Sequence, residues 1–191
     1  VSLTLFFTMI TSLVLGMGVP TTANYLITST IAAPIVMQLG VPALAAHLFT
    51  FYFGILADIT PPVALAAYAG SAIAKGNPFK TGVQATKLAV AAFIIPYIFV
   101  MNPALILIDT TAVDVIRITI TSLMGMFGIS AAMTGWLYGK ASWLERLFLL
   151  GSGLLLINPT LMTDIMGVGG ISAMIAFQYF KYKKIKPAQA A

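Results

Sequence analysis

Long apolar runs alternate with short breaks rich in Gly and Pro, and the first of these breaks carries no charge. Residues 1–15 and 23–39 are apolar stretches that flank residues 16–22. Glycine loosens a helix and proline lacks the N–H, so this segment predicts a helix break. A 15-residue arm reaches only ~22 Å of a ~30 Å bilayer core. We therefore favour a re-entrant hairpin with its tip inside the protein over two full spans joined by a neutral turn.

A second broken element follows the break at residues 40–42. Residues 43–74 form an apolar stretch that Asp58, Thr60, Pro61 and Pro62 interrupt. An unbroken helix over this stretch would be about 48 Å long, well beyond the bilayer core. The tandem prolines predict two half-helices that meet at depth.

The remaining apolar runs predict spans at residues 88–108, 118–138, 147–162 and 165–180. Charged residues fall between them in five groups: Lys75, Lys80 and Lys87; Asp109, Asp114 and Arg117; Lys140, Glu145 and Arg146; Asp164 alone; and Lys181, Lys183, Lys184 and Lys186. Assigning the first, third and fifth groups to the cytoplasm puts nine of the ten basic residues inside, as the positive-inside rule expects. The C-terminus is then cytoplasmic.

Composition supports a membrane protein. Of 191 residues, 60% are apolar and 8% charged, and the mean hydropathy is +1.00, which excludes an ordinary soluble domain. The net charge of +5 lies at the ends of apolar runs, so we expect no nucleic-acid partner. We expect an all-α integral membrane protein, polytopic, with a re-entrant hairpin and a Pro-broken discontinuous helix. Because the chain starts at Val1 without a basic n-region, we expect part of a longer protein rather than a signal peptide.

Asp58 is the one charged residue inside a predicted span, and such an acid is a functional candidate by default because burying it unpaired is costly. It could bind a cation or relay a proton. The alternative is a helix cap, since Asp ahead of a half-helix beginning near Pro61 is an ordinary N-terminal signal. Both interpretations stay open.

The first break supplies neutral oxygen donors suited to a hard cation or a substrate group. They are the side chains of Thr21, Thr22 and Asn24, beside main chain freed by Gly16, Gly18 and Pro20. Two discontinuous helices at matching depth are a pointer to a transporter site; the alternative is a kinked helix pair that satisfies its own backbone. The chain has a single His and one intramembrane Asp, too few catalytic side chains to favour a hydrolase. We therefore expect that it is not an enzyme and has no cofactor.

Other features have ordinary structural explanations. His47 lies on an apolar helix and is expected to be a hydrogen-bonded packing residue. Gly135 and Gly139 match GxxxG, which predicts close helix packing. The lysine-rich tail fixes orientation and can touch anionic lipid. Interfacial aromatics are expected at Tyr97, Trp136, Tyr138, Trp143, Tyr179 and Tyr182.

The segments GMGVPTTANYL at residues 16–26, GVPALAAH at 40–47 and ITPPVALAAY at 59–68 carry a family resemblance. The chain resembles the large membrane subunit of tripartite ATP-independent periplasmic (TRAP) transporters, most closely the fused form in which small and large permease subunits share one polypeptide. The resemblance is strong over residues 1–108 and continues through Asn102–Leu105 in sequence; residues 118–180 look like the additional C-terminal helices of that form.

The resemblance implies a secondary transporter of the inner membrane, driven by an ion gradient, usually Na⁺, that takes solute from an extracytoplasmic binding protein by an elevator mechanism. It implies a second-repeat region at 1–108 (hairpin 1–39, broken helix 43–74, span 88–108) followed by further helices and a basic tail at 109–186. Family ion sites use backbone carbonyls with Thr or Asn oxygens, which here selects Thr21, Thr22 and Thr60. The first repeat lies outside these residues, so the chain would hold half of the transport site.

Helix dipoles fit this picture independently. Half-helix N-termini near Thr21 and Pro61 would present positive dipole ends to an anionic group, which favours a carboxylate-bearing solute, while C-terminal carbonyls suit a cation. An ion channel and a non-transporting membrane scaffold remain the alternative functions.

Overall fold

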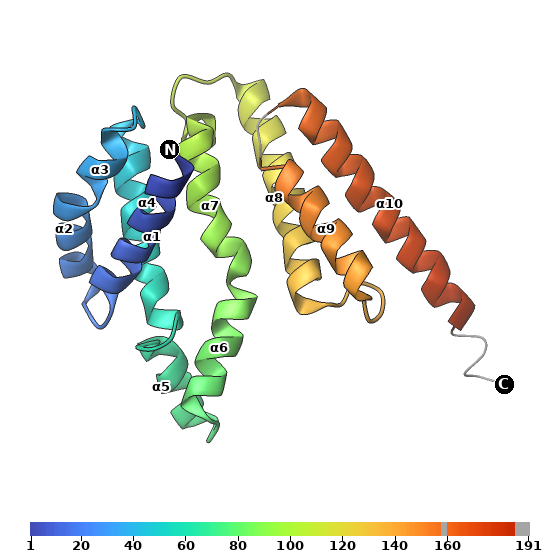
Figure 1. The fold of residues 1–191 in the computed structure, drawn as a ribbon, viewed down its shortest axis with the longest axis horizontal. Coiled ribbons are helices and arrows are strands. Elements are labelled where there is room, and N and C mark those ends of the chain that lie inside the picture. Colours follow the sequence, from blue (N-terminus) through green and yellow to red (C-terminus); the bar gives the residue numbers. More distant parts are fainter. Residues whose placement is uncertain (158–159, 186–191) are drawn as a thin grey trace. The chain divides into compact units, whose positions relative to one another are not determined.

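The computed structural model describes residues 1–157 and 160–185, and every regular element within these ranges is a helix. The expected all-α class is therefore confirmed. The chain divides into two compact units, Val1–Ile106 and Leu107–Ala191 (Figure 1). Within the described residues, two helices are long and apolar enough to cross a membrane, Ala112–Thr134 and Leu161–Lys183, together with one bent pair, Pro78–Leu88 and Val90–Met101.

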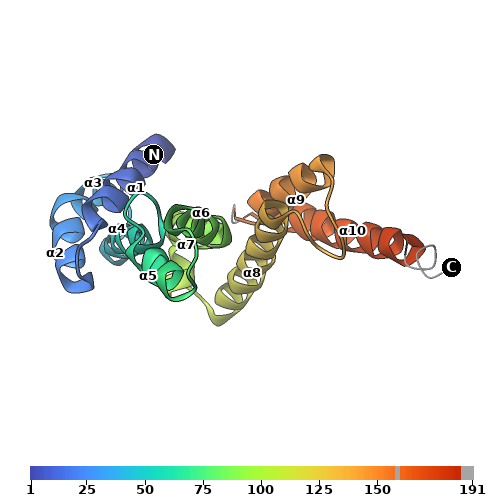
Figure 2. The ribbon, with the colours of Figure 1, turned by 90° about the horizontal axis from the view of Figure 1, so that it is seen from below.

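The first unit begins with a helical hairpin packed on one long helix. Helix α1 (Ser2–Gly16) is followed by a turn and by α2 (Thr21–Ile31), and the short α3 (Ala33–Met37) leads to α4 (Ala43–Leu56). Figure 2 shows α1, α2 and α3 on one side of α4 and helix α7 (Val90–Met101) on the other. The expected second arm at 23–39 is thus two helices, broken at Ala32.

Aromatic rings fill the core between α4 and α7. The ring centroid of Phe49 lies 4.9 Å from that of Phe53 and 5.3 Å from that of Tyr97. The Tyr97 hydroxyl donates to the sulfur of Met9, 3.3 Å away. Tyr97 is therefore half-buried against the core, and its position at a membrane interface stays a prediction. The apolar run that contains it gave no sign of which face is packed.

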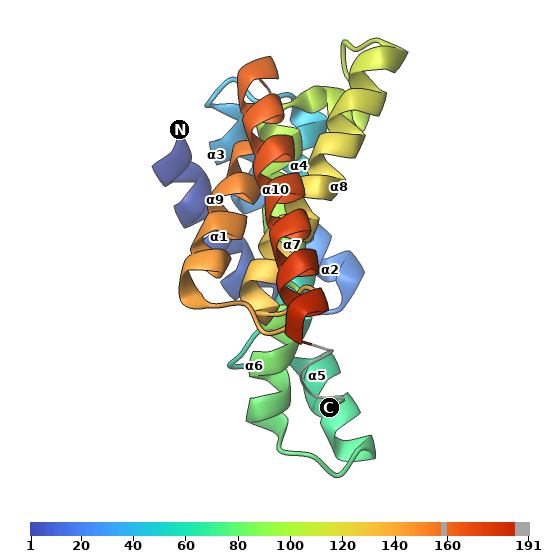
Figure 3. The same cartoon turned by 90° about the vertical axis from the view of Figure 1, so that its right-hand side faces the viewer.

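Helix α4 does not continue directly into the next helix. It passes into a 3-10 turn, η1 (Ala57–Ile59), then a non-helical segment, and α5 begins at Leu65 and ends at Ile73. Helix α6 (Pro78–Leu88) pairs with α5, and both extend beyond the end of α4 (Figures 1 and 3).

The predicted span at 88–108 differs from the structure. Helices α6 and α7 form a pair bent by 42°, and a short 3-10 turn, η2 (Pro103–Ile106), follows α7. Lys80 and Lys87 consequently lie on α6 rather than in a loop. The helix starts early because the Asn77 side chain accepts the Lys80 N–H and Pro78 occupies the first turn, an N-terminal signal of the usual kind.

Helices α1 and α4 touch backbone to backbone. A Cβ at Gly16 would collide with the main chain of Gly54, and a Cβ at Gly54 would collide with the side chain of Asn24. Glycine is required at both positions because any side chain would drive the helices apart.

Gly16→Ala should therefore lower the free energy of unfolding by about 1–3 kcal/mol, the usual cost of overpacking. Gly70→Ala is the matched control, since nothing lies within 4 Å of a Cβ there; it should be neutral or stabilise by roughly 0.5–1 kcal/mol. Thermal unfolding in detergent, followed by circular dichroism, measures both. Equal melting of the two variants would contradict the close contact.

The second unit is a three-helix assembly of α8 (Ala112–Thr134), α9 (Trp143–Leu155) and α10 (Leu161–Ile185). Helix α9 packs on both of the others. Glycines permit the close approach: a Cβ at Gly125 would lie 3.0 Å from the carbonyl oxygen of Gly153.

Three predictions for this unit were wrong. Helix α8 ends at Thr134 because Gly135 adopts φ +69°, so Gly135 and Gly139 lie in a turn and do not form a helix-packing motif. Helix α9 has 13 residues, about 20 Å, too short for the expected span at 147–162; Met162 belongs to α10, and residues 158–159 lie outside the described ranges. Asp164 is not in a loop. It lies in the first turn of α10, 7% exposed, with Oδ2 4.0 Å from Nε of Arg117.

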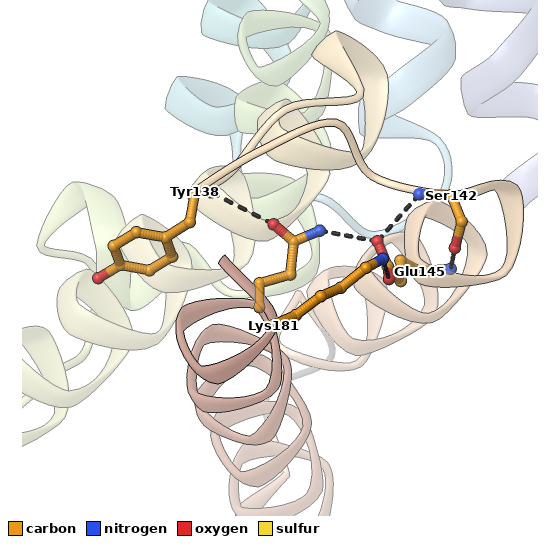
Figure 4. Close-up of polar contacts among 5 residues, drawn as sticks. Tyr138, Ser142, Glu145 and Lys181 are labelled. Carbon is orange, nitrogen blue, oxygen red and sulfur yellow. Dashed lines mark hydrogen bonds and ion pairs between the residues drawn. The ribbon is translucent and has the colours of Figure 1, made fainter. Parts of the chain in front are cut away.

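A buried polar network joins α9, α10 and the turn after α8 (Figure 4). Glu145 Oε2 accepts the Ser142 N–H at 2.9 Å and the Gln178 side-chain amide at 2.7 Å, while Oε1 lies 2.6 Å from the Lys181 ammonium. Gln178 in turn accepts the Tyr138 N–H at 3.2 Å. Burial raises the pKa of Glu145, but these donors and the Lys181 charge outweigh it and hold the pKa below its ordinary value. The predicted tail residue Lys186 lies outside the described ranges.

Because the folded-state pKa of Glu145 is depressed, its stabilising contribution is present at neutral pH and is lost as the pH falls below its ordinary value of 4.5. Glu145→Gln should cost about 1–3 kcal/mol at pH 7, as expected for hydrogen bonds to a charged group. The stability difference between wild type and variant should shrink on acidification. Thermal unfolding in detergent between pH 7 and pH 3 tests this, and a difference that stays constant over that range would contradict it.

Candidate functional site

The two helix breaks of the first unit lie against each other. The turn between α1 and α2 contains Gly18, at φ +72°, and a Cβ there would lie 3.9 Å from Cγ1 of Val63. Helix α1 also contacts η1. Since Val63 belongs to the segment between η1 and α5, the tip of the hairpin meets the gap in the discontinuous helix.

The second break is wider than the sequence indicated. Residues 60–64 are non-helical, the Pro61–Pro62 peptide is cis, and Ala64 has φ +39°. The half-helix therefore starts at Leu65 rather than near Pro61, and its N-cap is Ala64. Asp58 lies within η1 and is half-buried, so the prediction that it could cap this half-helix was wrong.

Side chains satisfy the main-chain carbonyls that the break frees. Thr60 Oγ1 donates to the Leu56 carbonyl at 2.7 Å, and the Tyr68 hydroxyl donates to the Pro62 carbonyl at 2.8 Å. Thr86, on α6, donates to the Ile59 carbonyl at 3.1 Å. These bonds matter because an unpaired backbone group away from water costs free energy. The sequence analysis did not predict this role of Thr86. Thr86 lies 27 residues from its partner, and no nearby residue indicates the contact.

Two buried oxygens, one on α1 and one on α2, have no hydrogen-bond partner. Asn24 is 2% exposed and packs on Gly54 with Oδ1 unpartnered, and Ser12, on the buried side of α1, is 0% exposed with Oγ unpartnered. Buried polar atoms are normally satisfied, so such atoms need an explanation. Asn24 was a predicted ligand; Ser12 was missed because it lies inside an apolar run.

The predicted threonines are distributed differently. Thr21 and Thr22 are exposed and line a groove of about 430 Å³ on α2 and α4, whose other lining residues are Tyr25, Leu44, His47, Leu48 and Phe51. Thr60 does not line it. The Tyr25 hydroxyl and His47 Nδ1 are 3.2 Å apart, so His47 is hydrogen-bonded as its packing role requires.

Neutral oxygens dominate the chemistry that this site offers. The described residues contain no group of three His, Cys, Asp or Glu side chains able to hold a metal ion. A cation here would rest on Asn, Ser and Thr oxygens with backbone carbonyls, a set suited to a hard ion.

Thr86→Val keeps the side-chain shape and removes the hydroxyl that bonds the Ile59 carbonyl. We expect a loss of about 1 kcal/mol and faster hydrogen exchange at the amides of residues 57–64. Thr81→Val is the matched control, because the Thr81 hydroxyl bonds only the Asn77 carbonyl one turn earlier on the same helix. Exchange measured by mass spectrometry distinguishes them, and unchanged protection of residues 57–64 in Thr86→Val would show that this bond does not hold the break.

Comparison with known proteins identifies the family of this chain. Residues 2–113 match the family model of the tripartite ATP-independent periplasmic transporter, DctM component. No curated protein and no solved structure gives a match. The matched segment covers the first unit and more than half of the chain. Members of the family are multi-pass membrane permeases of transporters. They work with an extracytoplasmic binding protein and a small permease component. With its two facing helix breaks inside the matched region, the chain belongs to the DctM family, the large permease component of TRAP transporters.

Proposed function

We propose that this chain forms the second-repeat part of a fused TRAP permease that imports a small carboxylate-bearing solute, driven by a Na⁺ gradient through an elevator mechanism. The observation that carries the proposal is the contact between the α1–α2 turn and the break after η1, together with the buried, unpartnered Asn24 oxygen on Gly54, which also meets Gly16 at the end of α1.

The depth of the hairpin tip supports a re-entrant arrangement. Helix α1 has 15 residues and α4 has 14, so each covers only ~21–22 Å, less than a bilayer core. Helices α5 and α6 extend the unit beyond the tip (Figure 3). A tip that stops beside the middle of a longer unit suits a hairpin that enters the membrane and returns.

Helix ends around the break offer both signs of partial charge. Helices α2 and α5 start there without a side-chain cap, so their positive dipole ends suit a solute carboxylate. Helix α1 and η1 end there with their carbonyls. A carbonyl that accepts one hydrogen bond, as that of Ile59 does from Thr86, keeps a second lone pair that suits a cation. We assign Na⁺ to these carbonyls with Asn24, Ser12 and Thr60, and keep Thr21 and Thr22 at the hairpin tip. Thr60 donates its proton to Leu56, which leaves its lone pairs for an ion.

The proposal places the permease in the inner membrane with the C-terminus of this chain in the cytoplasm. The rest of the fused permease supplies the first repeat and the other half of the transport site. An ion channel would need a pore-lining polar stripe, and a scaffold would need no unpartnered oxygen in its core; neither alternative is favoured by Asn24 and Ser12.

Uptake by the complete permease with its binding protein in proteoliposomes tests the function. An inward Na⁺ gradient should drive accumulation of the solute, and collapse of the Na⁺ and proton gradients together should abolish it. Unchanged accumulation after that collapse would exclude secondary transport. If a proton gradient alone drove accumulation, the coupling ion would be H⁺ rather than Na⁺.

Thr60→Ala should raise the Na⁺ concentration needed for half-maximal uptake by about 10- to 100-fold, because an interaction between a hydroxyl and an ion is worth roughly 1.5–3 kcal/mol. Thr30→Ala is the matched control, since the exposed Thr30 hydroxyl bonds the Leu26 carbonyl within α2 in the same back-bonded geometry. Na⁺ titrations of uptake by folded protein compare the two. Equal Na⁺ dependence in both variants would remove Thr60 from the ion site.

A further inference from the structure

A groove and a basic pocket both lie at the end of the second unit where α8 stops. The groove, of about 360 Å³, is mostly apolar and is lined by residues of α8, the turn after it and α10, among them Phe127, Ser130, Trp136, Tyr138 and Ile175. These residues lie outside the transport features described above.

The basic pocket is built by the residues that follow those of the groove along the chain. It is a hollow of about 60 Å³ lined by Gly139, Lys140, Gln178, Lys181 and Tyr182. Gly139 follows Tyr138 of the groove, and Gln178 lies one helical turn beyond Ile175 on α10, so neighbouring parts of the same turn and the same helix line the two hollows.

The polar network of Figure 4 holds this turn and this helix together. Gln178 accepts the Tyr138 N–H and donates to Glu145, so it ties the turn after α8 to both α9 and α10. Trp136 and Lys140 form an antiparallel bridge within the turn. The pocket is therefore built by buried hydrogen bonds, and Lys140 is carried on a fixed turn rather than a loose loop.

Charge in the pocket is positive after every partner is counted. Lys181 gives one donor to Glu145, lies 5.9 Å from the ring centroid of Phe177 and is 43% exposed, which leaves two N–H donors for another ligand. Lys140 is exposed. Arg146 is committed to the carbonyls of Ala132 and Met133 at the end of α8. The single acid, Glu145, offsets one lysine, so a phosphate would meet an uncompensated cation.

The position of the pocket along the helices suits a lipid. The candidate spans of α8 and α10 end at Thr134 and Lys183, on either side of the pocket. Exposed aromatics stand at the same end: Trp136 is 55% exposed, Tyr179 48% and Tyr182 40%. Such aromatics mark the membrane–water interface, so the apolar groove lies toward the hydrocarbon and the basic pocket at headgroup level.

We propose that the second unit binds one anionic phospholipid, with an acyl chain in the groove of α8 and α10 and the headgroup phosphate on Lys140 and Lys181. An amphiphile with a negative head matches both hollows, whereas a free anion leaves the apolar groove unused. This site is independent of the transport function.

Binding can be measured on the whole chain in a neutral detergent by native mass spectrometry. Dioleoyl phosphatidylglycerol is titrated against dioleoyl phosphatidylcholine, with inorganic phosphate as a competitor. We expect retention of one phosphatidylglycerol, at least fivefold weaker retention of phosphatidylcholine, and no displacement by millimolar phosphate. Equal retention of the two lipids, or displacement by phosphate, would overturn the proposal.

Two variant pairs locate the site without breaking the Glu145 network. Lys140→Gln should weaken phosphatidylglycerol binding about fivefold, as loss of one interfacial lysine does, while Lys183→Gln, which removes the same charge from an exposed lysine outside the pocket, should change it less than twofold. Ser130→Trp fills the groove and should abolish one-to-one retention; the exposed Ser172→Trp on α10 should not. Equal effects within either pair would overturn the assignment.

Discussion

The first unit depends on the direct approach of two helix backbones at Gly16 and Gly54. That contact fixes the end of α1 against α4, and the side chain of Asn24 closes on Gly54 from α2. Three helices therefore meet at Gly54, where the glycines leave room for hydrogen atoms only. This packing restricts the position of the turn between α1 and α2. Its Gly18 meets Val63 as a result. The two breaks are thus brought together by the close packing of helices at small residues. Attraction between the two turns is not needed.

Keeping the second break open requires partners for its main chain, and two of these come from outside it. Tyr68 supplies one from α5 and Thr86 another from α6. Helix α6 also lies close, since a Cβ at Gly82 would be 3.2 Å from Cγ of Pro61. The pair α5–α6 is therefore a support for the break rather than an appended hairpin, and any movement of residues 60–64 must be shared with α6.

The sequence was informative where backbone chemistry is local. Glycine and proline located both breaks, because they act on the residues that carry them. Ends of helices inside apolar runs were harder: α9 stops at Leu155, where the next two residues, Leu156 and Ile157, are also apolar. In a chain this apolar, the contrast between buried and exposed faces that reveals a helix is weak, which also hid the packing of Tyr97 against the core.

Contacts between residues distant in sequence could not be predicted from the sequence. Thr86 and Ile59 are joined only because α6 folds back on η1, and Ser12 resembles any other small polar residue of an apolar helix. Gly135 and Gly139 have the spacing of a packing motif, but that spacing has meaning only inside a helix, and the φ of +69° at Gly135 ends α8 first. The candidate ligands Asn24 and Thr60 could be named from sequence, whereas the unpartnered state of Asn24 is a property of the packed fold.

The short helix α9 explains why the polar network of the second unit lies at one end. A helix of 13 residues cannot carry both of its ends to water across a bilayer core, so its end groups need protein partners. At its start, Ser142 and Glu145 form a capping box, and Glu145 extends the cap to Gln178 and Lys181 of α10. At its far half, Gly153 lies against Gly125 and Ile129 of α8, which shields the backbone from lipid. The capped end carries charged groups that favour water, which agrees with the headgroup level that we propose for the lysines beside the groove.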